Sequence, residues 1–253
     1  MLLHLGRTIE SIENISLEIG ANHYLISGNG AAVYDIQKKE IVYSKFLSKE
    51  QVLKIAEVCE ENSIHYNVYT DKEIIAKNLS YNILYYHNEN LRKPENQRTY
   101  INIVSDMLNY LKNLNDNFLK VTICDEDINI FNGIIKKIKT LDKFDILDVE
   151  YMSKKKIKRG TEDYFVEYYY TEITNENVNK WTALEYIMNK LNISSKEVVA
   201  IGDNFNDREM IENSGLGIVM GNSNPFMKIM GDLIVTDNNS DGVCEAIEKF
   251  ILH

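Results

Sequence analysis

Apolar side chains recur along this chain with two spacings, one typical of strands and the other of helices. Residues 1–5 form a short apolar run that predicts a buried strand, and isoleucines then recur at helical spacing over 9–19. A second strand is expected over 24–27, where it ends at a glycine-rich turn. The chain therefore opens with a β-α-β unit, which favours a sheet of parallel strands.

The middle of the chain mixes helical spacing with alternation. Ser48 and Gln51 predict a capping box at the start of one helix, and a second helix is expected over 99–114. Alternating apolar positions predict half-buried strands over three ranges, which are 119–123, 146–152 and 164–170. This mixture indicates an α+β module with an antiparallel sheet, which we place at 46–162.

The last third returns to an α/β rhythm. A helix over 178–191 precedes three predicted strands, each followed by a helix; the strands are 198–201, 217–220 and 233–236. With the two strands at the start of the chain, five parallel strands are expected in two blocks, over 1–45 and 163–253, with the α+β module between them.

Composition and charge exclude several classes of protein. The 253 residues include 28 Lys and Arg against 38 Asp and Glu, a formal net charge of −10 that disfavours nucleic acid as a partner. No apolar run approaches the length of a membrane helix, so no membrane contact is expected. The three cysteines, which form no C-x-x-C, favour a reducing cytoplasm and are each expected to be buried. The sequence does not predict an oligomeric state.

The candidate chemistry centres on the stretch G-D-N-F-N-D at 202–207. Asp203 follows a predicted parallel strand, at the sheet edge where α/β folds bind ligands, and Asp207 follows four residues later. Two carboxylates in one loop suit Mg²⁺, which takes a few carboxylates together with water and phosphate. The alternative is that Asp203 is a turn residue and Asp207 a helix N-cap.

Two further positions gain meaning only in this context. Lys180, before an amphipathic helix, can give an ammonium to a phosphoryl oxygen, although an exposed lysine is the simpler interpretation. Asn29 and Gly30 follow a strand, where glycine lets backbone N–H groups approach a ligand; an ordinary turn is the alternative.

Taken in order, these segments resemble the haloacid dehalogenase-like superfamily, specifically the Cof-type phosphatases with a class IIB cap. The resemblance covers essentially the whole chain and rests on six stretches, which are 6–7, 27–31, 179–184, 202–207, 220–222 and 235–243. It implies a Rossmann-like core of two parts, 1–45 and 163–253, with an inserted α+β cap domain at 46–162. The core would lack the family's first strand.

The resemblance implies a Mg²⁺-dependent phosphatase of small phosphorylated metabolites that works through an aspartyl-phosphate. The residue at Asp203 would ligate the metal, with Asn206 and Asp207 supporting the metal shell. Lys180 and Asp207 would be catalytic, since Lys180 neutralises the transferring phosphoryl group. The substrate-binding residues would be Asn29, Gly30, Arg7 and Asn206.

Two departures from the family pattern concern catalysis. The motif D-x-D-G-T, which supplies the attacking carboxylate, is absent from this sequence, and Leu5 stands where the family has Thr or Ser before Gly-Arg. Covalent catalysis has no attacking group without that aspartate.

Four hypotheses follow from these departures. The sequence is a truncated or wrongly started copy of a phosphatase, a degenerate product without turnover, or a pseudoenzyme that binds a phosphorylated ligand or a protein partner. A general nucleotide-binding fold is the most distant, because no G-x-G-x-x-G follows the first strand.

Overall fold

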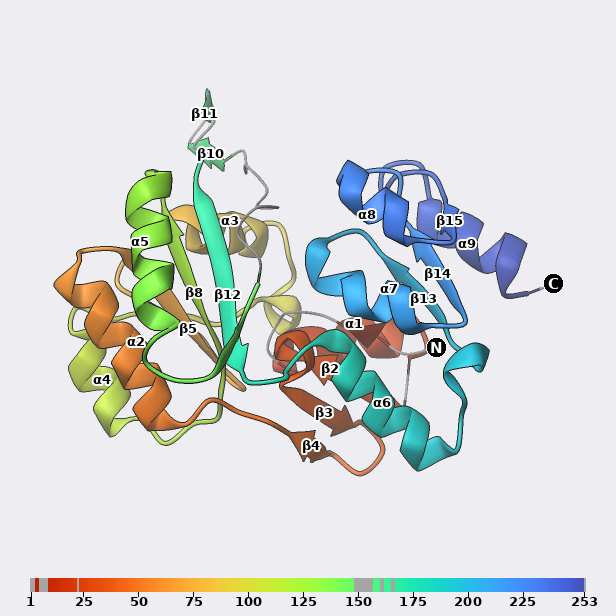
Figure 1. Ribbon diagram of the computed structural model, residues 1–253, viewed down its shortest axis with the longest axis horizontal. Coiled ribbons are helices and arrows are strands. Elements are labelled where there is room, and N and C mark those ends of the chain that lie inside the picture. The colour runs from red at the N-terminus through yellow and green to blue at the C-terminus, as the bar shows by residue number, and fades with distance from the viewer. Residues whose placement is uncertain are drawn as a thin grey trace. The chain divides into compact units, whose positions relative to one another are not determined.

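A computed structural model describes residues 3–4, 9–21, 23–147, 157–159, 162–164 and 167–252. By its own contacts the chain separates into two compact parts, Met1–Val178 and Asn179–His253, here called unit 1 and unit 2. Each unit has sheets of its own (Figure 1).

The first sheet of unit 1 has the order β1-β2-β3-β4. Its strands are β1 (Leu3–His4), β2 (Tyr24–Ser27), β3 (Ala32–Asp35) and β4 (Glu40–Ser44), and helix α1 (Ile9–Glu18) joins the first two. Because β1 and β2 are parallel, the predicted β-α-β opening is confirmed. The antiparallel β3–β4 pair was not anticipated. Gly20, at φ 72°, allows the chain to turn after α1.

The second sheet of unit 1 has the order β7-β6-β5-β8-β12-β9. Its strands are β5 (His65–Thr70), β6 (Ile74–Ala76), β7 (Ile101–Ile103), β8 (Phe118–Asp125), β9 (Phe144–Ile146) and β12 (Tyr169–Asn175). All neighbours are antiparallel except β6 and β7. The expected antiparallel sheet is therefore present. A separate hairpin is formed by β10 (Ile157–Arg159) and β11 (Glu162–Tyr164).

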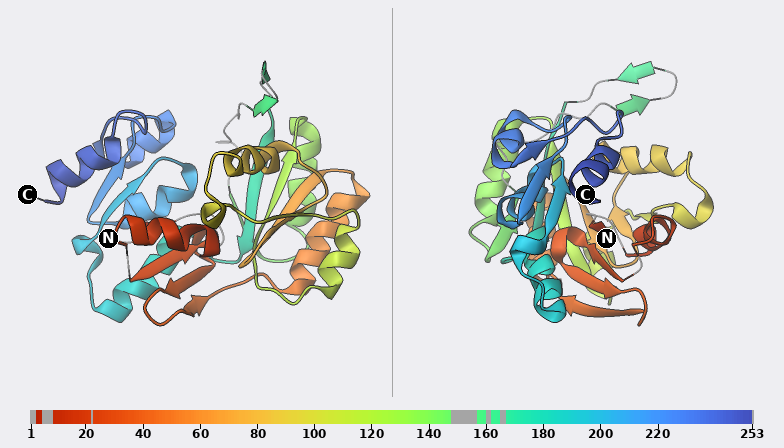
Figure 2. Two further views of the ribbon diagram at one scale, coloured as in Figure 1. Left: turned by 180° about the vertical axis from the view of Figure 1, so that it is seen from behind. Right: turned by 90° about the vertical axis from the view of Figure 1, so that its right-hand side faces the viewer.

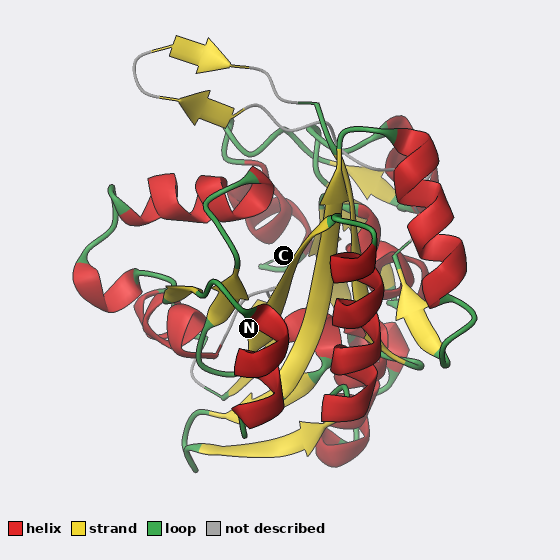
Figure 3. Cartoon of the chain, turned by 90° about the vertical axis from the view of Figure 1, so that its left-hand side faces the viewer, coloured by secondary structure: helices red, strands yellow, loops and turns green. Residues whose placement is uncertain are grey.

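Helices cover both faces of the six-stranded sheet. Three of them, α2 (Lys49–Glu61), α4 (Met107–Asn113) and α5 (Ile128–Ile138), share one apolar core with alternate residues of β5 and β8. Figure 3 shows helices packed along the long strands of this sheet. Helix α3 (Tyr81–Asn90) lies on the other face, where Tyr81 and Leu84 pack against Cys124 (Figure 2). The predicted capping box of Ser48 and Gln51 is confirmed at α2.

Two sequence expectations differ from the structure in this unit. The helix expected over 99–114 is instead strand β7 followed by α4, because Asp106 caps a new helix by accepting from the Asn109 N–H at 3.0 Å. The six-stranded sheet also includes β12, which lies beyond the expected boundary at 162. Most of the strand expected over 146–152 lies outside the described residues.

Unit 2 is a parallel sheet with the order β13-β14-β15. Its strands are β13 (Val199–Gly202), β14 (Leu216–Val219) and β15 (Leu233–Ile234), and its helices are α6 (Lys180–Leu191), α7 (Arg208–Asn213), α8 (Pro225–Met230) and α9 (Gly242–Phe250). The predicted α/β rhythm is therefore confirmed, and Asn224 caps the start of α8, whose first residue is Pro225. Within the described part of the chain, β13 pairs only with β14, and β1 only with β2.

Two further expectations concern the cysteines and the membrane. Cys59 and Cys124 are buried as expected, whereas Cys244 is exposed, because it lies on the solvent side of the short terminal helix α9. None of the helices among the described residues has the length and apolar character needed to cross a bilayer.

Candidate functional site

The centre of unit 2 is a buried ion pair. Lys180 begins α6 and Asp207 ends a single 3₁₀ turn, Phe205–Asp207, that follows β13. The Lys180 ammonium lies 2.5 Å from Asp207 Oδ1, and both residues are buried. The other carboxylate oxygen, Oδ2, accepts the backbone N–H groups of Asp203 at 3.0 Å and Asn204 at 3.1 Å. Asp207 thus fixes the loop that carries Asp203.

The loop closes this tightly because residue 202 is a glycine. A Cβ at Gly202 would lie 2.5 Å from Asp207 Cβ and 2.9 Å from its Oδ2, which is closer than atoms approach without displacement. The carboxylate of Asp207 therefore occupies space that any other side chain at 202 would take. Asp207 stands at the N-cap position of α7, as in the alternative interpretation, but its side chain makes no capping hydrogen bond there. Asn204 instead caps the 3₁₀ turn by accepting the Phe205 N–H at 2.8 Å.

Asp203 links three loops that follow neighbouring parallel strands. Its Oδ2 accepts from the Asn222 side chain at 3.0 Å, and the oxygen of that same amide accepts from the Asn238 N–H at 3.1 Å. These three residues come after β13, β14 and β15, so their loops meet at the carboxyl edge of the sheet, where α/β folds bind ligands. Asp203 is exposed.

At this edge of the sheet, Asp203 is the carboxylate that can serve as a ligand of Mg²⁺. One oxygen of Asp207 is paired with Lys180 and the other accepts two backbone N–H groups, whereas Asp203 is the exposed carboxylate of this loop. In the described part of the chain, no group of three or more His, Cys, Asp or Glu side chains is arranged to hold a metal. Mg²⁺ accepts such a sparse site, since it keeps several waters and takes phosphate oxygens as further ligands.

Asn29 and Gly30 lie in unit 1, in the turn that follows β2. The Asn29 amide donates a hydrogen bond to Glu172 of β12, and Lys120 of β8 lies 2.5 Å from the other oxygen of that carboxylate. The sequence reasoning missed Lys120 and Glu172. The signal was the alternation of β8, because Lys120 interrupts a strand that is buried on both faces.

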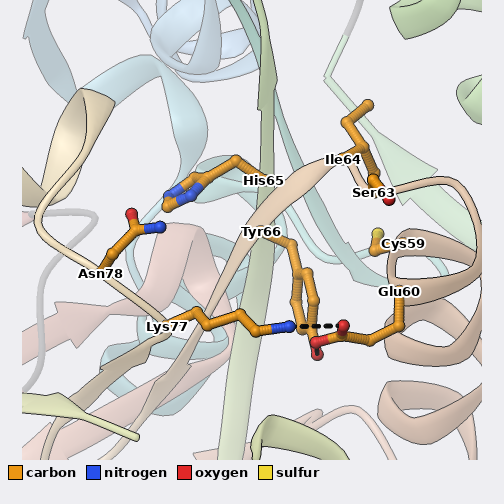
Figure 4. A pocket seen from close by; sticks show the side chains of 8 residues that line it. All are labelled: Cys59, Glu60, Ser63, Ile64, His65, Tyr66, Lys77 and Asn78. Carbon is orange, nitrogen blue, oxygen red and sulfur yellow. Dashed lines mark hydrogen bonds and ion pairs between the residues drawn. The ribbon is translucent and has the colours of Figure 1, made fainter. Parts of the chain in front are cut away.

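Unit 1 also holds a cavity of about 210 Å³ between the end of α2 and the start of β5 (Figure 4). Its two charged side chains neutralise each other, since Lys77 lies 2.7 Å from Glu60. Tyr66 donates to the same carboxylate at 3.1 Å. These partners satisfy the charges within the protein, so the cavity offers no charged group for catalysis.

The remaining candidate residues from the sequence are Asn206 and Arg7. Asn206 is half-buried in the 3₁₀ turn beside Asp207, whereas Arg7 lies outside the described residues. A D-x-D pattern without the following Gly-Thr is formed by Asp125 and Asp127 and has a structural role: Asp125 Oδ1 accepts the Asp127 N–H at 2.7 Å, and Asp127 caps α5. Unit 2 thus brings together Lys180, Asp203 and Asp207.

Comparisons with known proteins show the family of this chain. The sequence profile of the haloacid dehalogenase-like hydrolases matches residues 5–247. The chain is 31% identical over 173 residues to a phosphoglycolate phosphatase of Methanobrevibacter smithii, covering 66% of this chain and 68% of that protein. It is 23% identical over 253 residues to the pyridoxal phosphate phosphatase YbhA of Escherichia coli, covering 100% of this chain and 86% of that protein.

Solved structures share the fold. A haloacid dehalogenase-like hydrolase from Bacillus subtilis matches with a TM-score of 0.78 at 18% identity, covering 99% of this chain and 87% of that chain. A subclass IIB sugar phosphatase matches with a TM-score of 0.72 at 17% identity, covering 98% of this chain and 84% of that chain. The predicted α/β fold with an inserted module is confirmed.

Proposed function

Because the chain belongs to the haloacid dehalogenase-like hydrolase family, we propose that it binds small phosphate monoesters through unit 2, together with Mg²⁺. The observation that carries the proposal is the arrangement of Lys180, Asp207 and Asp203 at the carboxyl edge of β13–β15. The Asp207 carboxylate orients the loop and Lys180, while the Asp203 carboxylate is exposed.

Charge explains why both Lys180 and a cation are needed. The chain carries a formal net charge of −10, so a doubly charged phosphate group gains little from the protein as a whole. One of the three N–H bonds of Lys180 points at Asp207, and the other two can donate to phosphoryl oxygens. When bound, Mg²⁺ would neutralise phosphoryl charge, with Asp203 as its protein ligand.

The family and the named relatives support a small phosphorylated metabolite as the ligand. One relative is named for phosphoglycolate and another for pyridoxal phosphate, which share little beyond the phosphate ester. We assign Asn206, Asn29, Gly30 and Arg7 to the binding of that ligand. The segment 46–162 is assigned as the cap and the cytoplasm as the location, because a cap selects the organic group and phosphorylated metabolites are intracellular compounds.

Binding without turnover is the activity that these residues support. Hydrolysis through a covalent intermediate needs an attacking carboxylate, and the sequence contains no D-x-D-G-T. In addition, Leu5 has no hydroxyl with which to hold a phosphoryl group. Hydrolysis is the second candidate, favoured by the phosphatase names of the relatives.

The test combines calorimetry with a turnover assay on the full chain. Inorganic phosphate and p-nitrophenyl phosphate are titrated with and without Mg²⁺, and release of p-nitrophenol is followed in parallel. We expect saturable, Mg²⁺-dependent binding that Asp203→Asn weakens at least tenfold, with no product formed. Glu212→Gln, an exposed carboxylate of α7, is the matched control and should bind like the parent.

Either of two results would change this conclusion. If neither phosphate compound binds in the presence of Mg²⁺, the proposal is wrong. If p-nitrophenol is released and Asp203→Asn abolishes the release, the second candidate replaces it.

A further inference from the structure

Asn222, in the loop that follows β14, has its side-chain amide held at both ends. Its NH₂ group donates to Asp203 Oδ2 at 3.0 Å, and its oxygen accepts the backbone N–H of Asn238 at 3.1 Å. An ionised carboxylate only accepts hydrogen bonds and a backbone N–H only donates, so the amide cannot be reversed without losing both bonds. All three residues are exposed. The orientation of Asn222 therefore comes from these two partners and not from burial.

The backbone beside Asn222 is fixed as well. The N–H of Gly221 donates to the Thr236 carbonyl at 3.1 Å. A Cβ at Gly221 would lie 2.9 Å from the carbonyl oxygen of Val235, so the loop after β14 packs directly on the segment after β15. These two loops hold each other through backbone contacts. Asn222 thus presents its NH₂ group to Asp203 from a defined position.

The two carboxylate oxygens of Asp203 consequently differ. Oδ2 accepts from Asn222, whereas within the described parts of the chain Oδ1 takes part in no hydrogen bond or ion pair. A cation can bind Oδ1 while Asn222 keeps its bond. Binding through both oxygens would bring the cation toward the NH₂ group, whose hydrogens carry partial positive charge. The hydrogen bond from Asn222 therefore favours coordination by one oxygen.

Coordination by one oxygen distinguishes Mg²⁺ from Ca²⁺. Mg²⁺ demands a near-ideal octahedron with oxygens at about 2.0–2.1 Å and keeps several waters, which suits a carboxylate that offers one oxygen. Ca²⁺ takes more ligands, at about 2.3–2.6 Å, and accepts both oxygens of a carboxylate. We propose that Asn222 is a positioning residue that makes Asp203 a one-oxygen ligand, so that this site prefers Mg²⁺ to Ca²⁺. The inference rests on the proposed function and assigns the choice of cation to a residue of its own.

Two substitutions separate the contact with Asp203 from the contact with Asn238. Asn222→Ala removes both hydrogen bonds, whereas Asn222→Asp keeps an oxygen for the Asn238 N–H but has no hydrogen to donate to Asp203. If Asn222 acts on Asp203, both variants free Oδ2 and shift the site toward Ca²⁺. If Asn222 only holds the loop after β15, Asn222→Asp behaves like the parent. The added charge attracts both divalent cations, so the ratio of their dissociation constants is the informative quantity.

The experiment measures Mn²⁺ binding to the full chain by electron paramagnetic resonance, with p-nitrophenyl phosphate present throughout and Mg²⁺ or Ca²⁺ as the competitor. Binding that persists in Asp203→Asn is subtracted, because it comes from other acidic groups. Loss of a hydrogen-bond partner of a metal ligand lowers metal affinity about 10–100-fold, so we expect Asn222→Ala to weaken Mg²⁺ binding by about tenfold and Ca²⁺ binding by less than about threefold. Asn222→Asp should shift the ratio of the two dissociation constants toward Ca²⁺ in the same direction.

Asn239→Ala is the matched control, because Asn239 is an exposed asparagine beside Asn238 whose side chain makes no hydrogen bond within the described residues. It should leave both dissociation constants unchanged, and thermal unfolding shows that each variant is folded. The inference is overturned if Asn222→Ala weakens Mg²⁺ and Ca²⁺ equally, or if Asn222→Asp keeps the ratio of the parent. If the parent binds no more Mn²⁺ than Asp203→Asn does, the proposed function is itself wrong, and the inference falls with it.

Discussion

Replacing Lys180 by methionine should destabilise unit 2 strongly. The Asp207 carboxylate receives one ammonium at 2.5 Å and two backbone N–H groups at 3.0 and 3.1 Å. Methionine fills a similar volume but leaves this carboxylate without a counter-charge at a site where water has little access. Removing one partner of a buried pair costs about 3–5 kcal/mol. Because the two N–H donors remain, we expect the lower end, about 3 kcal/mol.

The double variant Lys180→Met with Asp207→Asn separates the two parts of that cost. The asparagine introduced at position 207 keeps an oxygen for the N–H groups of Asp203 and Asn204 and carries no charge to be buried. We therefore expect the double variant to be more stable than Lys180→Met alone, a non-additivity typical of groups in direct contact.

Urea unfolding followed by tryptophan fluorescence measures this effect where it occurs. Trp181 is the only tryptophan in the sequence and directly follows Lys180 in α6. With a denaturant dependence of about 2 kcal/mol per molar urea, a loss of about 3 kcal/mol lowers the midpoint by about 1.5 M. Lys249→Met, which removes an exposed pair with Glu245 in α9, is the control and should not move the midpoint. Equal urea midpoints for Lys180→Met and Lys249→Met would refute the reasoning.

Three further predictions concern packing, protonation and thiol reactivity. Gly202→Ala should displace Asp207 and destabilise by about 1–3 kcal/mol, whereas Gly133→Ala in α5, where a Cβ meets nothing within 4 Å, should stabilise by about 0.5–1 kcal/mol; thermal unfolding compares them. Burial lowers the pKa of His65 from 6.5 to about 4. Between these two pH values the imidazole is protonated in the unfolded chain and neutral in the folded chain, so up to about 3 kcal/mol of stability is lost as the pH falls from 6.5 to 4. Unfolding from pH 7 to 4 should be less pH-dependent in His65→Gln, and identical profiles would contradict this. Ellman's reagent should label one thiol in the folded chain, and Cys244→Ser should abolish that signal because the other two cysteines are buried.

Periodicity predicted the fold well where one face of an element is apolar. The helix α2 follows this rule, whereas the strands of unit 2 were predicted from short continuous apolar runs; all of them were placed within a few residues. The failure over 99–114 has a physical cause, because Ile101 fits a helical series with Val104 and also alternates with Ile103 as in a strand. Pairing of β7 with β6, which is a tertiary contact, decides between them.

The candidate site was predictable only in part. Asp203, Asp207 and Lys180 stand beside recognisable strand and helix ends, and in the structure Lys180 and Asp207 form an ion pair that the sequence did not predict. Glu172 and Lys120 are 52 positions apart, on strands whose pairing no local pattern specifies. Contacts that depend on how two strands pair, such as this one, therefore cannot be predicted from the sequence pattern alone.

The two units share one arrangement, in which a carboxylate lies between a buried lysine and one or more N–H donors. In unit 2, Asp207 binds a buried lysine through one oxygen and, through the other, holds the loop that follows β13. In unit 1, Glu172 binds Lys120 in the same way and holds the turn that follows β2. In each case the buried charge is costly and the group that it orients comes directly after a strand. A carboxylate between a lysine and a neutral N–H donor fixes polarity as well as position, because it can accept from both but donate to neither. Neutralising either carboxylate should therefore change which atoms its loop presents, even where the fold survives.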